Sequence, residues 1–93
     1  MPSMQRDEKI SGLANLGPKS QDMLARAGIT TVAQLRHIGA VVAYARVKQA
    51  DANASLNLLW ALEGALTGLP WQVVAREHRT SLLLALEEHQ RGT

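Results

Sequence analysis

One stretch, Ser55 to Gly68, constrains the fold more than any other part of the sequence. It reads SLNLLWALEGALTG and is rich in leucine and alanine, which are strong helix formers. A serine stands where it can cap the start, and a glycine stands where it can take the left-handed conformation past the end. The stretch therefore predicts a helix of about three turns over residues 55–67.

Apolar side chains cover more than one face of this expected helix. At about 100° per residue, one broad stripe is formed by Leu58, Leu59, Leu62, Ala65 and Leu66. A helix that is apolar around most of its surface packs against neighbours on both flanks, so we expect the rest of the chain to surround it. Glu63 should then pair with Arg36 or Arg46, because an unpaired carboxylate is costly to bury.

Length and composition place the chain among single globular domains. It has 93 residues, of which 46% are hydrophobic and 19% charged, and its net charge is +2. The absence of cysteine excludes disulfides and fits a cytoplasmic protein, and no apolar run approaches about 18 residues, which argues against a membrane partner. We expect a flexible lead-in over residues 1–9 and one helical domain over residues 10–93.

Two helices are indicated before residue 40. Pro18 suits the first position of a helix that Gly28 ends in a left-handed conformation. Thr31 and Gln34 form the signature of a capping box, which opens a second helix that Gly39 should close. The link between the two is only a few residues long, so they should form a hairpin or an angled pair.

Further helices are indicated in the rest of the chain. We expect one over residues 40–49, a helical turn that docks an aromatic side chain over residues 71–74, and a last helix over residues 77–90. No strand pattern is found. The sequence thus predicts an all-α bundle of five or six short helices around the helix at 55–67, with a helix-hairpin-helix-like N-terminal half.

Charge is distributed unevenly between the two halves. Residues 16–50 hold one acidic residue, Asp22, against the basic residues Lys19, Arg26, Arg36, Arg46 and Lys48. Residues 51–93 hold three arginines against five acidic residues, Asp51, Glu63, Glu77, Glu87 and Glu88. The basic half is open to two interpretations, a solvated helix face or the binding surface for an anionic partner.

The segment from Leu13 to Leu35 resembles the helix-hairpin-helix element of DNA repair and recombination proteins. The matching residues are Asn15-Leu16-Gly17-Pro18-Lys19 and Ala27-Gly28-Ile29-Thr30-Thr31-Val32. Asn15 replaces the first glycine of the family pattern, and Ser11-Gly12 disfavour a regular helix before the hairpin, so the first arm can be missing.

In that element the hairpin and the next helix start present free backbone N–H groups to a DNA phosphate. The resemblance implies a weak contact with DNA phosphate, and the cations of the basic half could add to it. The candidate residues are Asn15, Gly17, Lys19, Ser20, Arg36, Arg46 and Lys48.

A wider segment, from Ser11 to Leu86, resembles the C-terminal domain of the TfoX/Sxy family of bacterial competence regulators. The resemblance is carried by Leu16-Gly17-Pro18-Lys19-Ser20, Ala27-Gly28-Ile29-Thr30-Thr31, Leu35-Arg36, Gly39-Ala40, Tyr44, the run Ser55 to Gly68, and Trp71. It implies an all-helical domain that regulates DNA-uptake genes and is not an enzyme. Full-length members carry an α/β domain first, so the implied partners include a regulator protein and a separate α/β protein.

Groups for catalysis cannot be assembled from the sequence. The three histidines, His37, His78 and His89, share no metal-ligand spacing with one another or with carboxylates. Ser20 and Ser55 stand at expected helix starts, where a hydroxyl is structural, and no nucleotide-binding loop is present. We therefore expect no catalytic residue, no metal and no cofactor.

A second candidate surface is the other side of the helix at 55–67. It consists of Asn57, Trp60, Gly64 and Thr67, where a tryptophan beside small residues could receive a partner helix or a second copy of the domain. The alternative is that another helix of the chain covers Trp60. The function we expect is a weak DNA contact that assists another regulator, which would use both surfaces; the alternative is a protein-interaction or dimerisation module with no direct DNA binding. Cations gathered around the hairpin favour DNA, and scattered cations favour a protein partner.

Overall fold

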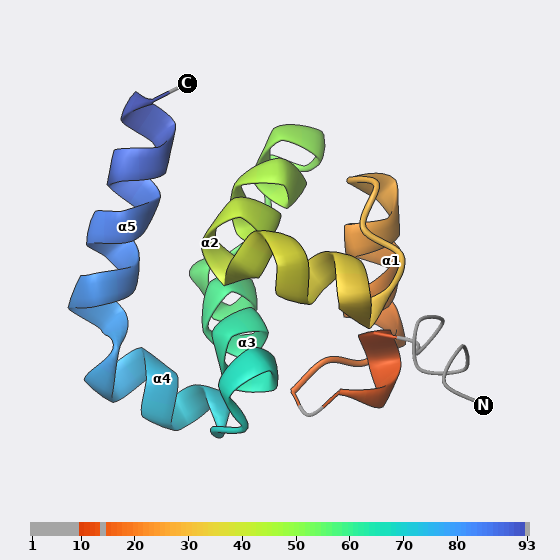
Figure 1. Ribbon diagram of the computed structural model, residues 1–93, viewed down its shortest axis with the longest axis horizontal. Helices are drawn as coiled ribbons and strands as arrows, with labels where there is room; N and C mark the ends of the chain where they lie inside the picture. The colour runs from red at the N-terminus through yellow and green to blue at the C-terminus, as the bar shows by residue number, and fades with distance from the viewer. Residues whose placement is uncertain (1–9, 14, 93) are drawn as a thin grey trace.

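The computed structural model describes residues 10–13 and 15–92. Within these residues the regular structure consists of helices joined by turns, with no strand (Figure 1). The elements in chain order are a 3₁₀ helix η2 (Ile10–Gly12) and the helices α1 (Pro18–Arg26), α2 (Val32–Ala50), α3 (Leu56–Thr67), α4 (Trp71–Glu77) and α5 (Arg79–Arg91). The predicted fold class is confirmed. The expected lead-in over residues 1–9 lies outside the described residues, and no described helix is long and apolar enough to cross a bilayer.

Helix α3 is the most deeply buried helix of the domain. Leu59 and Leu62 are fully buried, and Trp60 is 3% exposed. In Figure 1, α2 passes in front of α3, and α1 and α5 lie to its two sides. The central position predicted from its two apolar faces is confirmed, because burial extends around most of its circumference.

Gly39 bends α2 into two halves. Its φ of 82° and ψ of 167° are not helical, and they interrupt the helix between residues 38 and 40. Figure 1 shows the yellow first half crossing the front of the molecule and the green second half turning upward. The prediction that Gly39 separates two helices is therefore confirmed, since glycine adopts this positive φ without steric cost.

Local capping signals are satisfied at both ends of the α1–α2 link. Thr31 Oγ1 accepts a hydrogen bond from Gln34 N at 3.2 Å, and Gln34 Oε1 accepts one from Thr31 N at 3.1 Å. Gly28 has a φ of 85°, and the next amide, Ile29 N, donates back to Leu24 O at 2.9 Å. The predicted capping box and left-handed helix end are confirmed.

Two expectations for the polar residues of the central helix are wrong. The Ser55 side chain forms no capping hydrogen bond with α3. Glu63 forms no ion pair with Arg36 or Arg46; the ion pairs in the described part of the chain join other residues. Glu63 is only half-buried and both arginines are exposed, so solvent satisfies all three charges.

The connector before α3 is fixed by two side chains of α2. Tyr44 Oη donates to Ala54 O at 3.2 Å, and Lys48 Nζ donates to Ala52 O at 2.7 Å and to Ala54 O at 3.0 Å. Burial of Tyr44 raises the pKa of its phenol above the usual value. These bonds hold the chain at the start of α3 and use the ammonium group of Lys48 for structure.

The structure decides between the two interpretations of Trp60 and corrects the expectation for Trp71. Trp60 lies inside the domain, and the Arg79 guanidinium at the start of α5 sits 5.8 Å from its ring centroid. Trp71, expected to dock in the core, is 37% exposed, and Val74 is the fully buried residue of α4. The expectation of an aromatic docked by residues 71–74 is thus wrong, because α4 turns Val74 inward instead.

Candidate functional site

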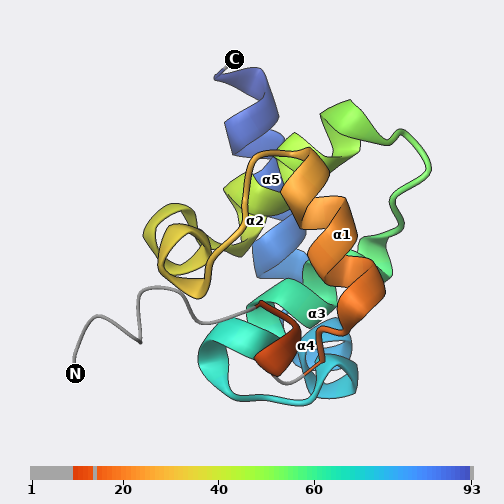
Figure 2. The same ribbon diagram turned by 90° about the vertical axis from the view of Figure 1, so that its right-hand side faces the viewer.

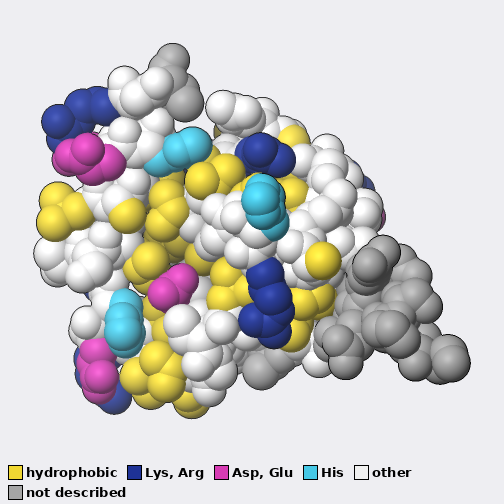
Figure 3. Space-filling view, viewed as in Figure 1, with side chains coloured by type: hydrophobic (Ala, Val, Ile, Leu, Met, Phe, Trp, Pro, Cys, Tyr) yellow, Lys and Arg dark blue, Asp and Glu magenta, His cyan; other side chains and the backbone are white. Residues whose placement is uncertain are grey.

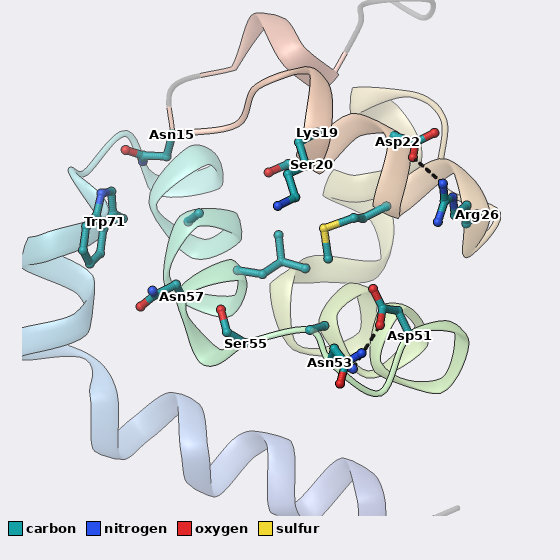
Figure 4. A pocket seen from close by; sticks show the side chains of 14 residues that line it. Asn15, Lys19, Ser20, Asp22, Arg26, Asp51, Asn53, Ser55, Asn57 and Trp71 are labelled. Carbon is teal, nitrogen blue, oxygen red and sulfur yellow. Dashed lines mark hydrogen bonds and ion pairs between the residues drawn. The ribbon is translucent and has the colours of Figure 1, made fainter.

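A groove of about 590 Å³ lies between α1, the connector at 51–55 and the start of α3 (Figure 4). Its apolar lining includes Ala54, Leu58 and Ala61, each no more than 9% exposed, and the half-buried Met23. Trp71 stands at one edge, where it is one of two exposed large apolar side chains in the described chain. The groove thus combines an apolar floor with an exposed aromatic rim.

Polar groups surround this floor from three segments. In Figure 4, Lys19 and Ser20 project from α1, Ser55 and Asn57 from the start of α3, and the connector supplies a third polar edge. The remaining polar residues of the lining are Asn15, Asp22, Arg26, Asp51 and Asn53. Side-chain amides and hydroxyls therefore provide donors and acceptors around most of the opening.

The charges of the groove balance one another. Arg26 pairs with Asp22 at 3.0 Å, so neither carries an uncompensated charge. Asp51 Oδ1 accepts a hydrogen bond from Asn53 N at 3.0 Å. Lys19 is the one other charged residue of the lining, and it forms no ion pair within the described residues. One lysine and one aspartate remain, and the groove has no basic character.

The start of α1 has backbone donors that no side chain caps. Gly17 is the N-cap residue, with an extended conformation at φ −117°, and it has no side chain to accept a bond. Pro18 follows at the first helical position and has no N–H, which leaves the amides of Lys19 and Ser20 as first-turn donors. The prediction that the bend leaves its amides uncapped is consistent with this geometry.

Asn15 has a structural role that the sequence did not indicate. Its φ is 71°, and its Nδ2 donates to Leu69 O at 2.9 Å. Figure 2 shows the red and orange N-terminal turn beside the cyan loop that leaves α3. Asn15 therefore joins the turn before α1 to the loop between α3 and α4, and this amide hydrogen bond is not available to a phosphate.

The predicted cations do not gather at the turn. Lys19 lines the groove, whereas Arg46 lines a separate hollow beside His37. Lys48 is bound to connector carbonyls, and Arg36 is exposed and lines neither cavity. On the face of the molecule seen in Figure 3, the Lys and Arg side chains form separate patches. Of the seven predicted phosphate-contact residues, Asn15, Lys19 and Ser20 line the groove.

The predicted partner face on α3 is not an exposed surface. Trp60 is 3% exposed and Gly64 is buried, so the expectation that they receive a partner is corrected. An ideal Cβ on Gly64 would lie 2.5 Å from Leu69 O, so the α3–α4 loop occupies this side of α3. Asn57 and Thr67 are exposed, and Asn57 lines the groove.

Trp71 is the site residue that sequence reasoning missed. Its position after Gly68-Leu69-Pro70 indicated a turn, but aromatic character alone suggested burial. Helix α4 starts at Trp71 itself, and a side chain at the first helical position next to an exposed Pro70 remains accessible. The loop that packs on Gly64 also places this tryptophan beside the α1 groove.

The first arm of a helix-hairpin-helix element is reduced in the described chain. The segment before Asn15 forms the 3₁₀ helix η2 of three residues, Ile10–Gly12, in place of a regular α-helix. Ile10 is fully buried and anchors this segment in the core. Within residues 10–13 and 15–92, no three His, Asp or Glu side chains come together as they would at a metal site.

Comparison with known proteins assigns the family. The family model of the TfoX C-terminal domain matches residues 6–86, and the chain belongs to this family of all-α domains. It is 33% identical over 86 residues to the DNA transformation protein TfoX of Haemophilus influenzae. That alignment covers 92% of the chain and 40% of the relative, so the chain spans about two fifths of the relative's length.

Two crystal structures of Listeria monocytogenes proteins share the fold. One is of an uncharacterized protein, with a TM-score of 0.75 and 28% identity; the match covers 87% of this chain and 92% of that one. The other is of a protein of unknown function, with a TM-score of 0.74 and 30% identity over 88% of this chain and 98% of that one. The arrangement of helices is therefore found in crystals of related chains.

Proposed function

We propose that the chain is a non-enzymatic regulatory domain that supports DNA uptake by binding a protein partner in the groove between α1 and α3. The family assignment and the similarity to a DNA transformation protein support the regulatory role. The groove supports the mode of action, since a family alone does not define a binding site.

The single observation that carries protein binding is the make-up of this groove. Its floor is apolar, its rim is polar, and its charges are balanced. Protein interfaces have this anatomy, with a desolvated apolar centre, a polar rim and an aromatic residue as an anchor. A surface dedicated to DNA instead gathers lysines and arginines along a phosphate path, and here those residues are dispersed.

The polar rim indicates the chemistry of the bound segment. The first-turn amides of α1 and the Lys19 ammonium favour a carboxylate or another anionic group at that end of the groove. Trp71 and the apolar floor favour an aliphatic or aromatic side chain next to it. Such a segment could belong to another regulator protein or to a separate α/β protein of the kind found in longer family members.

Genetic complementation with Trp71→Ala tests this proposal. Deleting the gene should lower the frequency of DNA transformation, and the wild-type gene should restore it. Trp71→Ala should restore at most about a tenth of that frequency, because loss of an anchoring tryptophan commonly costs an interface 2 kcal/mol or more. The measurement is the number of transformants per viable cell at equal protein abundance.

The matched control is Gln72→Ala. Gln72 is exposed on the same helix but does not line the groove, so it should restore transformation fully. Thermal unfolding of both purified variants should differ little from wild type, which separates lost binding from lost folding. Full restoration of the transformation frequency by Trp71→Ala would rule out the groove as the binding site. An unchanged transformation frequency after gene deletion would rule out the regulatory role.

DNA binding remains the second candidate because the uncapped start of α1 lies beside Lys19. Fluorescence anisotropy with labelled duplex DNA at about 50 mM salt separates it from protein binding. The groove composition predicts no concentration-dependent change for wild type. A rise that fades with added salt and is abolished by Lys19→Glu would instead establish phosphate contact and contradict a purely protein-binding groove.

A further inference from the structure

A second hollow lies inside the bend of α2. It holds about 320 Å³ and is bounded by the α1–α2 turn, the first half of α2 and one residue of the second half. Ile29, Ala33 and Ile38 make its walls largely apolar, and His37 and Arg46 stand at its rim. Its volume is sufficient for one branched aliphatic side chain.

The charge at this rim is positive and uncompensated. Arg46 is exposed and forms no ion pair with any described residue. Arg36, next to His37 in the chain, is likewise exposed and unpaired among those residues. The Gln34 carboxamide oxygen is already occupied by the capping box. A ligand of this hollow should therefore combine an aliphatic group with a carboxylate.

Helix α5 presents that combination on its outer face. Leu84 is 57% exposed, and among the described residues it and Trp71 are the large apolar side chains classed as exposed rather than partly buried. Four residues later, Glu88 is exposed and forms no ion pair in the described chain, whereas the neighbouring Glu87 pairs with Arg91 at 2.8 Å. Residues four apart lie on one helix face, so Leu84 and Glu88 form one patch.

We propose that two copies of this chain associate by inserting Leu84 of one copy into the α2 hollow of the next, with Glu88 facing Arg46. Shape and charge both match: an aliphatic side chain meets apolar walls, and a carboxylate meets an unpaired guanidinium. The basic first half of the chain thereby meets the mildly acidic second half. Leu82 and Leu86 hold the opposite side of α5 in the core, so Leu84 cannot reach the hollow of its own chain.

The contact is head-to-tail, since the hollow and the α5 patch are different surfaces. Once two copies have joined, one of them keeps a free hollow and the other a free patch, so association should continue beyond the dimer or close into a ring. One leucine and one ion pair make a small interface, which should be weak and sensitive to salt. The expected result is a weight-average mass, measured by sedimentation equilibrium, that rises steadily with protein concentration.

Sedimentation equilibrium of the purified chain tests this contact. The average mass should rise with concentration at low salt, and Leu84→Glu should weaken the association by about tenfold or more. Gln72→Glu adds the same single negative charge at an exposed residue of α4 that lines neither hollow, and it should leave the association unchanged. Circular dichroism of each variant checks that the fold is retained. A wild-type chain that stays monomeric up to about millimolar concentration overturns the proposal.

A charge exchange makes the test specific. Arg46→Glu and Glu88→Arg should each abolish self-association, because each places like charges across the contact. Mixing the two variants should restore assembly, and so should combining both changes in one chain. Two results would contradict the contact between Leu84 and the α2 hollow. One is self-association of the single variants that equals that of wild type; the other is a mixture of the two variants that does not assemble while wild type does.

Discussion

Replacing Leu62 with alanine is expected to lower the free energy of unfolding by about 2–5 kcal/mol. Leu62 is fully buried on α3, where neighbouring helices enclose it. Removing its branched end leaves a cavity that a helix packed on both flanks cannot close by a small movement. Chemical denaturation followed by circular dichroism measures the change, with the slope against denaturant compared between variants.

Leu84→Ala is the matched control for this effect. Leu84 is also a helical leucine, but it is 57% exposed, so the same truncation should change stability by no more than about 0.5 kcal/mol in dilute solution. Equal losses for the two variants would mean that α3 is not enclosed as described. A loss confined to Leu62→Ala locates the core on the central helix.

Gly64→Ala is expected to destabilise the domain by about 2 kcal/mol, although alanine is the better helix former. An ideal Cβ at this position would lie 2.5 Å from Leu69 O and 2.6 Å from Asn15 Nδ2. Both atoms belong to the hydrogen bond that ties the turn before α1 to the α3–α4 loop. The new methyl group must displace that loop, and the resulting strain exceeds the gain in helix propensity.

Gly12→Ala serves as the control, since no heavy atom lies within 4 Å of a Cβ built there. It should leave the denaturation midpoint close to that of wild type, whereas Gly64→Ala should lower it. A stabilised Gly64→Ala variant would show that the loop does not pack against α3. The result bears on the groove as well, because the same loop positions Trp71.

Features that depend on short-range signals were predictable from the sequence. The capping box at Thr31 and Gln34, the left-handed glycines and the bend at Gly39 each depend on residues close in the chain. The central helix was predictable for a related reason, since apolar residues on two faces require neighbours on two sides. These signals specify helix ends and burial without reference to distant contacts.

Features that depend on distant contacts were not predictable in the same way. Trp60 and Trp71 are both aromatic, and which of them is buried depends on how distant elements pack: Trp60 is 3% exposed with Arg79 of α5 over its ring, whereas Trp71 is 37% exposed. Asn15 matched a phosphate-binding pattern, yet its amide bonds Leu69 O, which is 54 residues away. Glu63 forms no ion pair within the described residues, and the two candidate arginines on α2 are exposed to solvent.

The basic half of the chain shows the same limit. The sequence between residues 16 and 50 contains five basic residues, but it does not show on which part of the surface each side chain lies. In the folded domain, Arg26 forms an ion pair with Asp22 and Lys48 donates hydrogen bonds to the connector. Lys19 and Arg46 line different hollows. A charge imbalance in sequence becomes a binding surface only when helices bring the charges together.

Native-state hydrogen exchange of the α3 amides tests the central claim, that the domain is built around α3, most directly. Amides between Leu59 and Ala65 should exchange only through global unfolding, with protection that equals the free energy of unfolding from denaturation. Amides in the exposed last turn of α5 should exchange much faster. Exchange of the α3 amides at the rate of the α5 end would contradict the central position of α3.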